Sequence, residues 1–224
     1  MEFKIVTYGK GNMEIEKINN FWIPSNDEQI EKWRKEGHPH MQDRCLNRLL
    51  THCKVRNIKF KTILDIGAWC GTWSLAMQKY AENIFCYEPD KTHFACLEKN
   101  LESFNHVSLY NHAIGNEDGF VKLSEETATQ NTRVIQEKGD TKICTIDSLN
   151  LDNIDLIKID VEGFEMEVLK GATETIKNVQ YIMIELNNNT KRYGSSNLEI
   201  EKYLPTLGFK MLFKIWPDII YIKK

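Results

Sequence analysis

The sequence lacks the features that mark secreted, membrane-spanning and nucleic-acid-binding proteins. No apolar run in its 224 residues has the length of a membrane span, and residues 1–6 are too short and polar a stretch for a signal peptide. A net charge of -3 provides no polycationic surface, so nucleic acid is a weak candidate partner, and no membrane partner is expected. The length and a hydrophobic content of 42% are instead typical of one α/β domain with a sizeable core.

Cysteine motifs are missing too, because no two of the six cysteines form a C-x-x-C pair. They stand at positions 45, 53, 70, 86, 96 and 144, several of them within apolar segments, as Cys86 does. This pattern favours reduced, mostly buried thiols over a disulfide framework or a zinc site. The cytoplasm is therefore the expected location.

The dinucleotide fingerprint G-x-G-x-x-G is also absent, although a related strand, turn and helix are present. An apolar run of strand length begins near Thr62 and ends in Asp65 and Gly67, and Gly71 opens an amphipathic helix. About 20 residues after the turn, a second short strand ends in Glu88, as the fingerprint also requires. This order is typical of a mononucleotide-binding βαβ unit.

Each part of this unit has a physical role in binding a nucleoside. Gly67 lets a ligand approach the main chain, and the helix after Gly71 offers unpaired N–H groups to a carboxylate or phosphate. Glu88 has two acceptor oxygens for the two hydroxyls of a ribose. A turn without the pyrophosphate glycines that carries the carboxylate of Asp65 suits a ligand with an amine and no diphosphate, such as S-adenosylmethionine (SAM). The alternative is that Asp65 merely caps the turn.

Residues 1–60 precede this unit and have a less regular pattern. Helices are predicted from Ser25 and from Met41 to Val55, so we expect an N-terminal helical segment that acts as a cap or lid, or as the surface of a possible homodimer. In a lid, His38 and His40 would lie near the substrate; otherwise they are exposed loop residues.

A third predicted strand, Val107 to Asn111, ends next to a small residue, Ala113. An amide and a small side chain there would suit the edge of a purine, although a simple polar turn explains them equally well. Residues 115–150 then resemble an insertion with two strands and a polar stretch between them. That stretch, Ser124 to Asp140, is long enough for a substrate loop, or is a solvated loop without a role.

Three acids follow two further predicted strands. Asp160 and Glu162 come after the buried-looking run Leu156 to Ile159, and Glu185 lies near the end of a strand that runs from Val179. Ligands in doubly wound sheets bind outside the carboxyl ends of the strands, so these acids are expected at the catalytic site. They would orient a hydroxyl, take its proton or hold a divalent cation, which the sequence does not require.

Structural roles for the same acids remain open. Asp160 and Glu162 precede the helix that Gly163 opens, so either acid is also a candidate helix cap. Glu185 needs a partner if it faces inward, and Lys191 or Arg192 would supply one.

The pattern of the last two predicted strands distinguishes between two families of proteins with doubly wound sheets. Two strands, 209–215 and 219–222, are joined by Trp216-Pro217-Asp218, which is a hairpin turn, so the last pair must be antiparallel. NAD-binding domains usually lack that hairpin, whereas SAM-dependent class I methyltransferases have it. We therefore predict a Rossmann-like, doubly wound, seven-stranded, mostly parallel sheet with an antiparallel C-terminal hairpin.

Several motifs together sharpen this comparison. They are Asp65-Ile66-Gly67-Ala68, Glu88-Pro89 and Ile157-Lys158-Ile159-Asp160-Val161-Glu162-Gly163-Phe164-Glu165. With them, the chain resembles the FkbM family of SAM-dependent methyltransferases from about residue 60 to its C-terminus, so a methyltransferase domain is expected over 61–224. One departure follows the first glycine, where the family commonly has Asn and this chain has Ala68-Trp69-Cys70. The bulky indole of Trp69 therefore lies in the cofactor turn.

The resemblance implies roles for individual residues. The methionine half of SAM would lie along the turn, with Asp65 near its amine, Glu88 on the ribose, and Asp160 facing the sulfonium and the acceptor beside Glu162 and Glu185. The implied cofactor-binding set is Asp65, Gly67, Ala68, Trp69, Gly71, Glu88, Pro89, Asn111, Ala113 and Asp160.

The expected function is SAM-dependent O-methylation of a small-molecule hydroxyl, on a sugar, a glycan or a secondary metabolite. Methyl transfer to nitrogen or to a protein group is an alternative, and so is a SAM-binding module without catalysis. An NAD-dependent oxidoreductase is disfavoured by the missing glycines and by the terminal hairpin.

Overall fold

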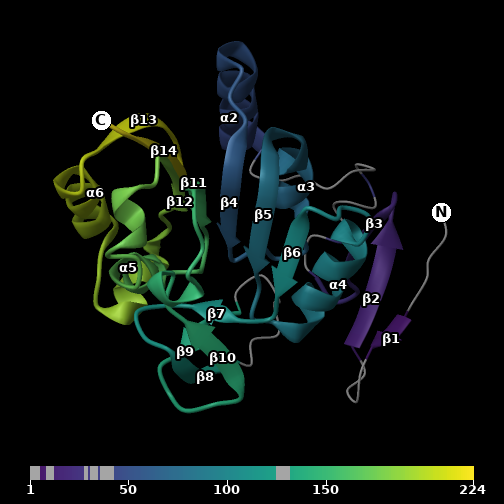
Figure 1. Ribbon diagram of the computed structural model, residues 1–224. Helices are drawn as coiled ribbons and strands as arrows, with labels where there is room; N and C mark the ends of the chain where they lie inside the picture. Colours follow the sequence, from purple (N-terminus) through teal and green to yellow (C-terminus); the bar gives the residue numbers. More distant parts are fainter. Residues whose placement is uncertain (1–5, 9–12, 28–29, 31–34, 36–42, 125–131) are drawn as a thin grey trace.

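The computed structural model describes residues 6–8, 13–27, 30, 35, 43–124 and 132–224. A seven-stranded sheet lies at its centre, with the strand order β13-β14-β12-β11-β4-β5-β6 (Figure 1). In chain order these strands are β4 (Phe60–Ile66), β5 (Ala81–Tyr87), β6 (Val107–Tyr110), β11 (Ile154–Ile159), β12 (Tyr181–Glu185), β13 (Phe209–Ile215) and β14 (Asp218–Lys223).

The pairing of these strands confirms the predicted fold class. β4, β5, β6, β11 and β12 pair in parallel, whereas β14 is antiparallel to both β12 and β13. Parallel neighbours need crossover connections, which contain the helices α3 (Thr72–Met77), α4 (Lys91–Leu101) and α5 (Glu165–Lys170). The other helices are α2 (Asp43–Arg56), which precedes β4, and α6 (Asn197–Thr206), which precedes β13. Short 3₁₀ helices are η1 (Gln78–Tyr80), η3 (Asp147–Leu149), η4 (Thr175–Lys177) and η5 (Asn188–Tyr193).

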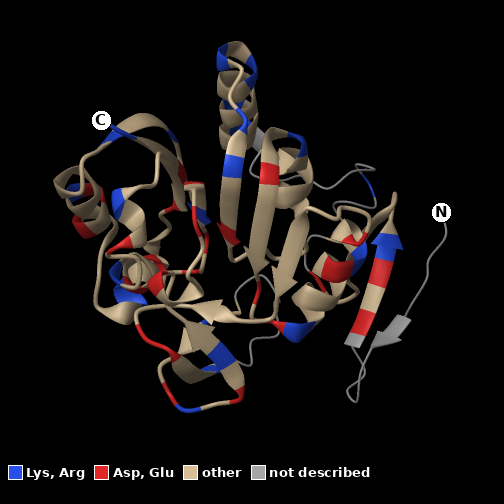
Figure 2. Cartoon of the chain, viewed as in Figure 1, with Lys and Arg blue, Asp and Glu red and all other residues tan. Residues whose placement is uncertain are grey.

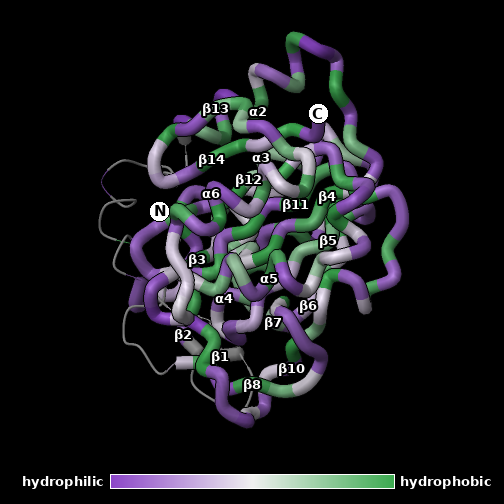
Figure 3. The backbone as a smooth tube through the Cα atoms, turned by 90° about the vertical axis from the view of Figure 1, so that its left-hand side faces the viewer, coloured by the Kyte–Doolittle hydropathy of each residue, from purple (hydrophilic) through white to green (hydrophobic). Residues whose placement is uncertain are grey.

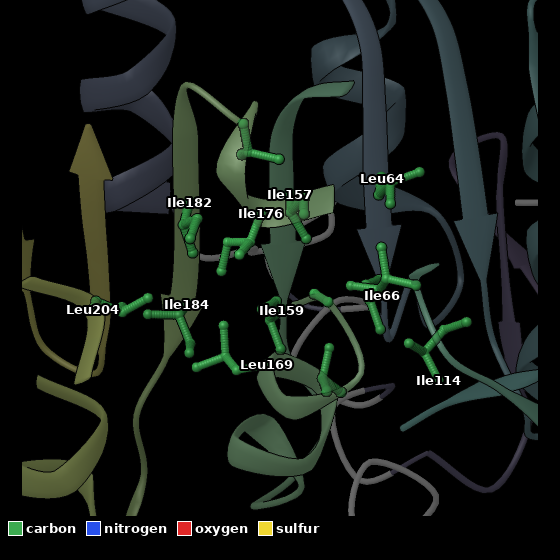
Figure 4. Packing of buried hydrophobic residues seen from close by; sticks show 14 of the residues in the cluster. Leu64, Ile66, Ile114, Ile157, Ile159, Leu169, Ile176, Ile182, Ile184 and Leu204 are labelled. Carbon is green, nitrogen blue, oxygen red and sulfur yellow. The ribbon is translucent and has the colours of Figure 1, made fainter. Parts of the chain in front are cut away.

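Alternating side chains of the strands fill two separate cores, one on each face of the sheet. On one face Leu64 and Ile66 lie in the same buried cluster as Leu169 of α5 and Leu204 of α6 (Figure 4). On the other face Ile63 joins a cluster that includes residues of α2, α3 and α4. Each fully buried Leu or Ile contributes roughly 1.5–3 kcal/mol. The strands of the central sheet are therefore rich in apolar residues, which colour much of their length green in Figure 3.

Charged residues are found mainly outside the interior of the central sheet. Lys, Arg, Asp and Glu lie mainly on helices, loops and strand ends (Figure 2). No helix in the described part of the chain combines the length and the apolar character that crossing a bilayer requires.

The insertion forms a small sheet of its own, with the order β7-β10-β8-β9. Its strands are β7 (Ala113–Ile114), β8 (Gly119–Leu123), β9 (Val134–Ile135) and β10 (Thr141–Cys144). The two strands predicted from sequence correspond to β8 and β10, whereas β9 was hidden within the polar stretch. Residues 125–131 of that stretch lie outside the described residues.

The N-terminal segment differs from the predicted helical segment. β1 (Val6–Tyr8), β2 (Met13–Ile18) and β3 (Phe21–Pro24) form an antiparallel sheet, which lies beside α4 (Figure 1). The missed signal is the turn Asn19-Asn20, where both residues have positive φ (47° and 69°), as a tight hairpin requires. The helix predicted from Met41 is present as α2, whereas most of the helix predicted from Ser25 lies outside the described residues, as do His38 and His40.

Asn100 of α4 connects this N-terminal sheet to the turn after β4. The backbone N–H of Trp22 donates to Asn100 Oδ1 at 2.7 Å. Asn100 Nδ2 donates to the carbonyl oxygens of Trp22 and Cys70, each at 2.8 Å. Whether the segment is a lid or a dimer surface stays a prediction.

Candidate active site

A cavity of about 340 Å³ opens at the carboxyl ends of the central strands, a volume within the range of small-molecule sites. Its lining comes from four neighbouring strands and from the insertion. The residues are Gly67, Ala68 and Trp69 after β4; Glu88 and Pro89 after β5; Asp160, Val161 and Glu162 after β11; Glu185 of β12; and Thr132, Arg133 and Val134 next to and within β9. The edge to which the sequence assigns ligand binding is thus the edge at which the cavity lies.

The turn after β4 passes so close to β11 that only glycine fits at its start. Gly67 has φ +75°, and a Cβ there would meet the carbonyl oxygen of Asp160 at 1.7 Å. Trp69 also has a positive φ, 49°, an uncommon conformation for a residue with a side chain. The turn therefore exposes main chain to the cavity on one side and touches the backbone of Asp160 on the other.

The turn is held by Glu88, whose side chain is only 7% exposed. The N–H of Trp69 donates to Glu88 Oε2 at 2.8 Å, and the N–H of Asp90 donates to Oε1 at 2.9 Å. Each carboxylate oxygen retains acceptor capacity for a further donor. Glu88 therefore fits the predicted role at a ribose and also orders the turn.

His93 was not recognised from the sequence, yet it lines the cavity beside Glu88. Its Nδ1 lies 3.6 Å from Glu88 Oε1 and 3.7 Å from Asp90 Oδ1. Burial lowers the pKa of His93, but the hydrogen bond and charge of Glu88, with Asp90 and Asp27, raise it above the ordinary value. Its Nε2 is buried without a hydrogen-bond partner among the described residues, so a polar group of a ligand would find a partner there.

Asp65 lies beneath the turn rather than in the cavity. It is fully buried, and Ser74 Oγ donates to its Oδ2 at 2.6 Å. Lys158, its neighbour in register on β11, places Nζ 3.0 Å from Asp65 Oδ1. This arrangement favours the interpretation in which Asp65 orders the turn over a direct contact with an amine.

Lys158 joins three parts of the site, a role that no sequence pattern indicates. Besides Asp65, its Nζ lies 3.5 Å from Asp160 Oδ2 and donates to the carbonyl oxygen of Gly67 at 2.8 Å. Burial lowers the pKa of Lys158, but the charges of Asp65 and Asp160 outweigh this effect and raise it above the ordinary value. A buried ammonium thus compensates negative charge on both acids.

Asp160 lies among further carboxyl groups. The charge of Asp160, then burial, then Asp218 raise the pKa of Glu185 to about 9. Burial and Asp160 raise the pKa of Asp218 to about 7. Glu185 is therefore protonated at neutral pH, which makes it a hydrogen-bond donor. Asp218 was expected only in the hairpin turn.

Glu162 is held by the segment that follows β12. It accepts hydrogen bonds from Asn187 Nδ2 at 3.2 Å and from Asn189 Nδ2 at 2.8 Å. Burial, and then the charge of Asp160, raise the pKa of Glu162 to about 7. These amides are the partners that a buried carboxyl group needs.

The remaining predicted residues are only partly brought to the cavity. Ala113 lines it, with His112 and Ile114, whereas Gly71 and Asn111 do not. Asn111 Nδ2 instead donates to the carbonyl oxygens of Glu88 and Pro89, at 2.8 and 2.9 Å, and so supports the wall behind them.

The acids do not support the divalent cation that the sequence left open. Among residues with a described placement, no group of three or more His, Cys, Asp or Glu side chains is arranged to hold a metal ion. The carboxylate of Glu162 is turned toward Asn187 and Asn189 and accepts their hydrogen bonds. It is therefore not oriented to share a metal ion with Asp160 and Glu185.

The strand order and the antiparallel β14 are those of the class I methyltransferases. The family model described as "Methyltransferase FkbM domain" matches residues 61–211. The chain belongs to the FkbM family of methyltransferases, which confirms the predicted family.

A curated relative is the hexuronic acid methyltransferase AglP of Haloferax volcanii, 27% identical over 150 residues. The match covers 63% of this chain and 62% of the relative's length. Magnesium protoporphyrin IX methyltransferase from Synechocystis PCC 6803, solved with bound SAM, has a TM-score of 0.51 at 12% identity, over 89% of this chain and 93% of that one. The N-methyltransferase NodS from Bradyrhizobium japonicum WM9, solved with S-adenosylhomocysteine, has a TM-score of 0.50 at 11% identity, over 87% and 91%. At such identities these structures show the fold alone.

Proposed function

We propose that this chain transfers the methyl group of SAM to a hydroxyl group of a saccharide. The proposal depends chiefly on one observation: a single cavity joins the turn after β4 and Glu88 to the carboxyl groups of Asp160 and Glu185. Membership of the FkbM family and the hexuronic acid methyltransferase among the relatives support it.

The residues along the turn and after β5 fit the two halves of the cofactor. The main chain at Gly67 and Ala68 would lie against the methionine half, and Glu88 would accept hydrogen bonds from the ribose, with His93 Nε2 nearby. Ala113 would border the base. SAM supplies a methyl group that its sulfonium already activates, so the protein contributes mainly alignment of the acceptor oxygen.

Asp160 would take the proton of the acceptor hydroxyl as the new bond to oxygen forms. An alcohol is a poor nucleophile near neutral pH, so a positioned base contributes about 10²–10⁴-fold to the rate. Lys158 compensates the charge of Asp160 before the proton arrives. The protonated carboxyl group of Glu185 would donate a hydrogen bond to Asp160 and so hold this base in position.

Calorimetric titration with S-adenosylhomocysteine, with magnesium and with EDTA, tests the cofactor site. We expect binding in the micromolar range that EDTA leaves unchanged. Asp160→Asn should retain this binding and lose at least about 100-fold in turnover of labelled SAM on a sugar panel, because only the base is removed. Absence of binding would contradict the cofactor site, and full turnover by Asp160→Asn would contradict the role of the base.

Other expectations belong to the same proposal. All six cysteines are buried free thiols, which supports a reducing compartment such as the cytoplasm. A homodimer and the absence of a nucleic-acid partner stay predictions; light scattering and a binding assay with mixed RNA would test them.

A further inference from the structure

We propose that Arg133 binds a carboxylate of the acceptor, so that the acceptor is an acidic saccharide of the uronic acid class rather than a neutral sugar. This inference rests on the proposed function. It assigns the wall next to β9 to the acceptor end of the cavity and names the residue that selects among sugars.

Arg133 lies at the start of the short strand β9 and lines the cavity. Its backbone is fixed to the end of β8: its N–H donates to Ser124 Oγ at 3.1 Å, and its carbonyl oxygen accepts from the N–H of Ser124 at 2.9 Å. The side chain is half-buried. A cationic group on a fixed backbone at a cavity wall is suited to position a ligand.

Tyr193 fixes this wall relative to the catalytic acids. Its hydroxyl donates to the carbonyl oxygen of Val134 at 2.6 Å, and its ring packs edge-on against Phe164 at 4.9 Å. Tyr193 ends η5, which with the preceding Asn187 holds Glu162. One segment thus contacts both Val134, the neighbour of Arg133, and Glu162.

The charges of the cavity explain why an acidic acceptor needs Arg133. The acids that line it are Glu88, Asp160, Glu162 and Glu185, and its basic residues among those described are Lys158, Arg133 and histidines. Lys158 contacts Asp65 and Asp160, whereas Arg133 belongs to the wall next to β9. A carboxylate on the acceptor would be repelled by the charge of Asp160 and drawn to the guanidinium of Arg133, whose planar fork matches carboxylate geometry. The sugar hydroxyl would then point toward Asp160.

The test compares acidic and neutral acceptors that differ in one group. Transfer of labelled methyl from SAM is measured with the full chain on 4-nitrophenyl β-D-glucuronide and β-D-glucoside, and on the corresponding galacturonide and galactoside. We expect an acidic member to be preferred at least about 10-fold in kcat/KM. Arg133→Met should lower the acidic-to-neutral ratio by about 10- to 100-fold, mainly through KM, and Arg133→Lys should recover part of it.

Arg56→Met is the control, because Arg56 is an exposed arginine at the end of α2, before the start of β4, and does not line the cavity. Its acidic-to-neutral ratio should equal that of the wild type. A ratio that Arg133→Met leaves unchanged, or wild-type turnover confined to the neutral glycosides or to a sugar phosphate, would overturn the inference.

Affinity for S-adenosylhomocysteine separates this inference from the function on which it rests. All variants should bind it as the wild type does, which also shows that they fold. Normal binding without turnover of any acidic glycoside overturns the acceptor class alone. Absence of binding in the wild type overturns the proposed function as well.

Discussion

Glu185 and Asp218 lie directly opposite each other on the antiparallel strands β12 and β14. Both pKa values are raised, that of Glu185 to about 9 and that of Asp218 to about 7, and the charge of Asp160 contributes to each shift. The sheet thus places two acids on one rung beside a third. Three neighbouring carboxyl groups hold fewer than three negative charges at neutral pH, since like charges so close disfavour ionisation.

Stability should therefore fall as pH rises. The ordinary pKa of Glu185 is 4.5 and the folded value is about 9, so between these values the native state binds more protons than the unfolded state. By linkage, the free energy of unfolding then decreases with increasing pH across this window. Glu185→Gln, which mimics the protonated acid, should reduce the loss.

Thermal unfolding of wild type and Glu185→Gln between pH 6 and 9 measures this effect. We expect the variant to lose less, by a difference on the order of a few degrees. Glu117→Gln, at an exposed glutamate, serves as the control and should follow the wild type. Parallel curves for Glu185→Gln and wild type would contradict the raised pKa.

Lys158→Met should destabilise the fold strongly. Removing the ammonium leaves the buried carboxylate of Asp65 without its ion pair, which costs about 3–5 kcal/mol. The double variant Asp65→Asn/Lys158→Met removes both charges and should recover part of this loss. Urea unfolding gives the values; a double variant less stable than Lys158→Met would show that the pair is not the source of the effect.

Gly67→Ala should also be severe. The added Cβ would overlap the carbonyl oxygen of Asp160, and the positive φ alone costs about 1–3 kcal/mol for a residue with a side chain. We expect loss of S-adenosylhomocysteine binding together with reduced stability. Gly119→Ala is the control, because nothing lies within 4 Å of a Cβ there. Equal behaviour of the two variants would mean that β4 and β11 do not approach as closely as described.

Asn100→Ala tests the connection between the N-terminal sheet and the turn. The change leaves two backbone groups of Trp22 and the carbonyl of Cys70 without a partner, at about 1–3 kcal/mol for each buried group. Hydrogen exchange should become faster at β3 and around Cys70. Asn83→Ala, at an exposed asparagine, should leave both regions protected. Unchanged exchange in Asn100→Ala would show that the sheet is held by its apolar contacts alone.

The sequence predicted those parts of the molecule whose pattern is local. Apolar runs that end in Glu88 and Asp160 identify two buried strands and the edge of the sheet at which they end. The hairpin around Trp216-Pro217-Asp218 could be predicted because a short turn between two strands leaves only antiparallel pairing.

Features set by distant residues could not be predicted. Lys158 occupies one position of an apolar strand, and its partner Asp65 lies 93 positions earlier in the chain. The sequence places Asp218 in a turn. Its proximity to Glu185 follows from the pairing of β14 with β12, which no local pattern indicates. Asn111 does not line the cavity as predicted, but donates a hydrogen bond to the carbonyl oxygen of Glu88. Which carbonyl oxygen an amide side chain reaches depends on the fold.

The approach of Gly67 to Asp160 restricts how this enzyme can be redesigned. The main chain that would receive the cofactor and the main chain that would carry the base touch each other, so a side chain at Gly67 would displace the backbone of Asp160. The wall formed by residues 132–134 borders the cavity from the small sheet of the insertion and not from the central sheet. New acceptor preferences are therefore best sought by varying residues 132–134, where side chains can change while the alignment of methyl group and base is kept.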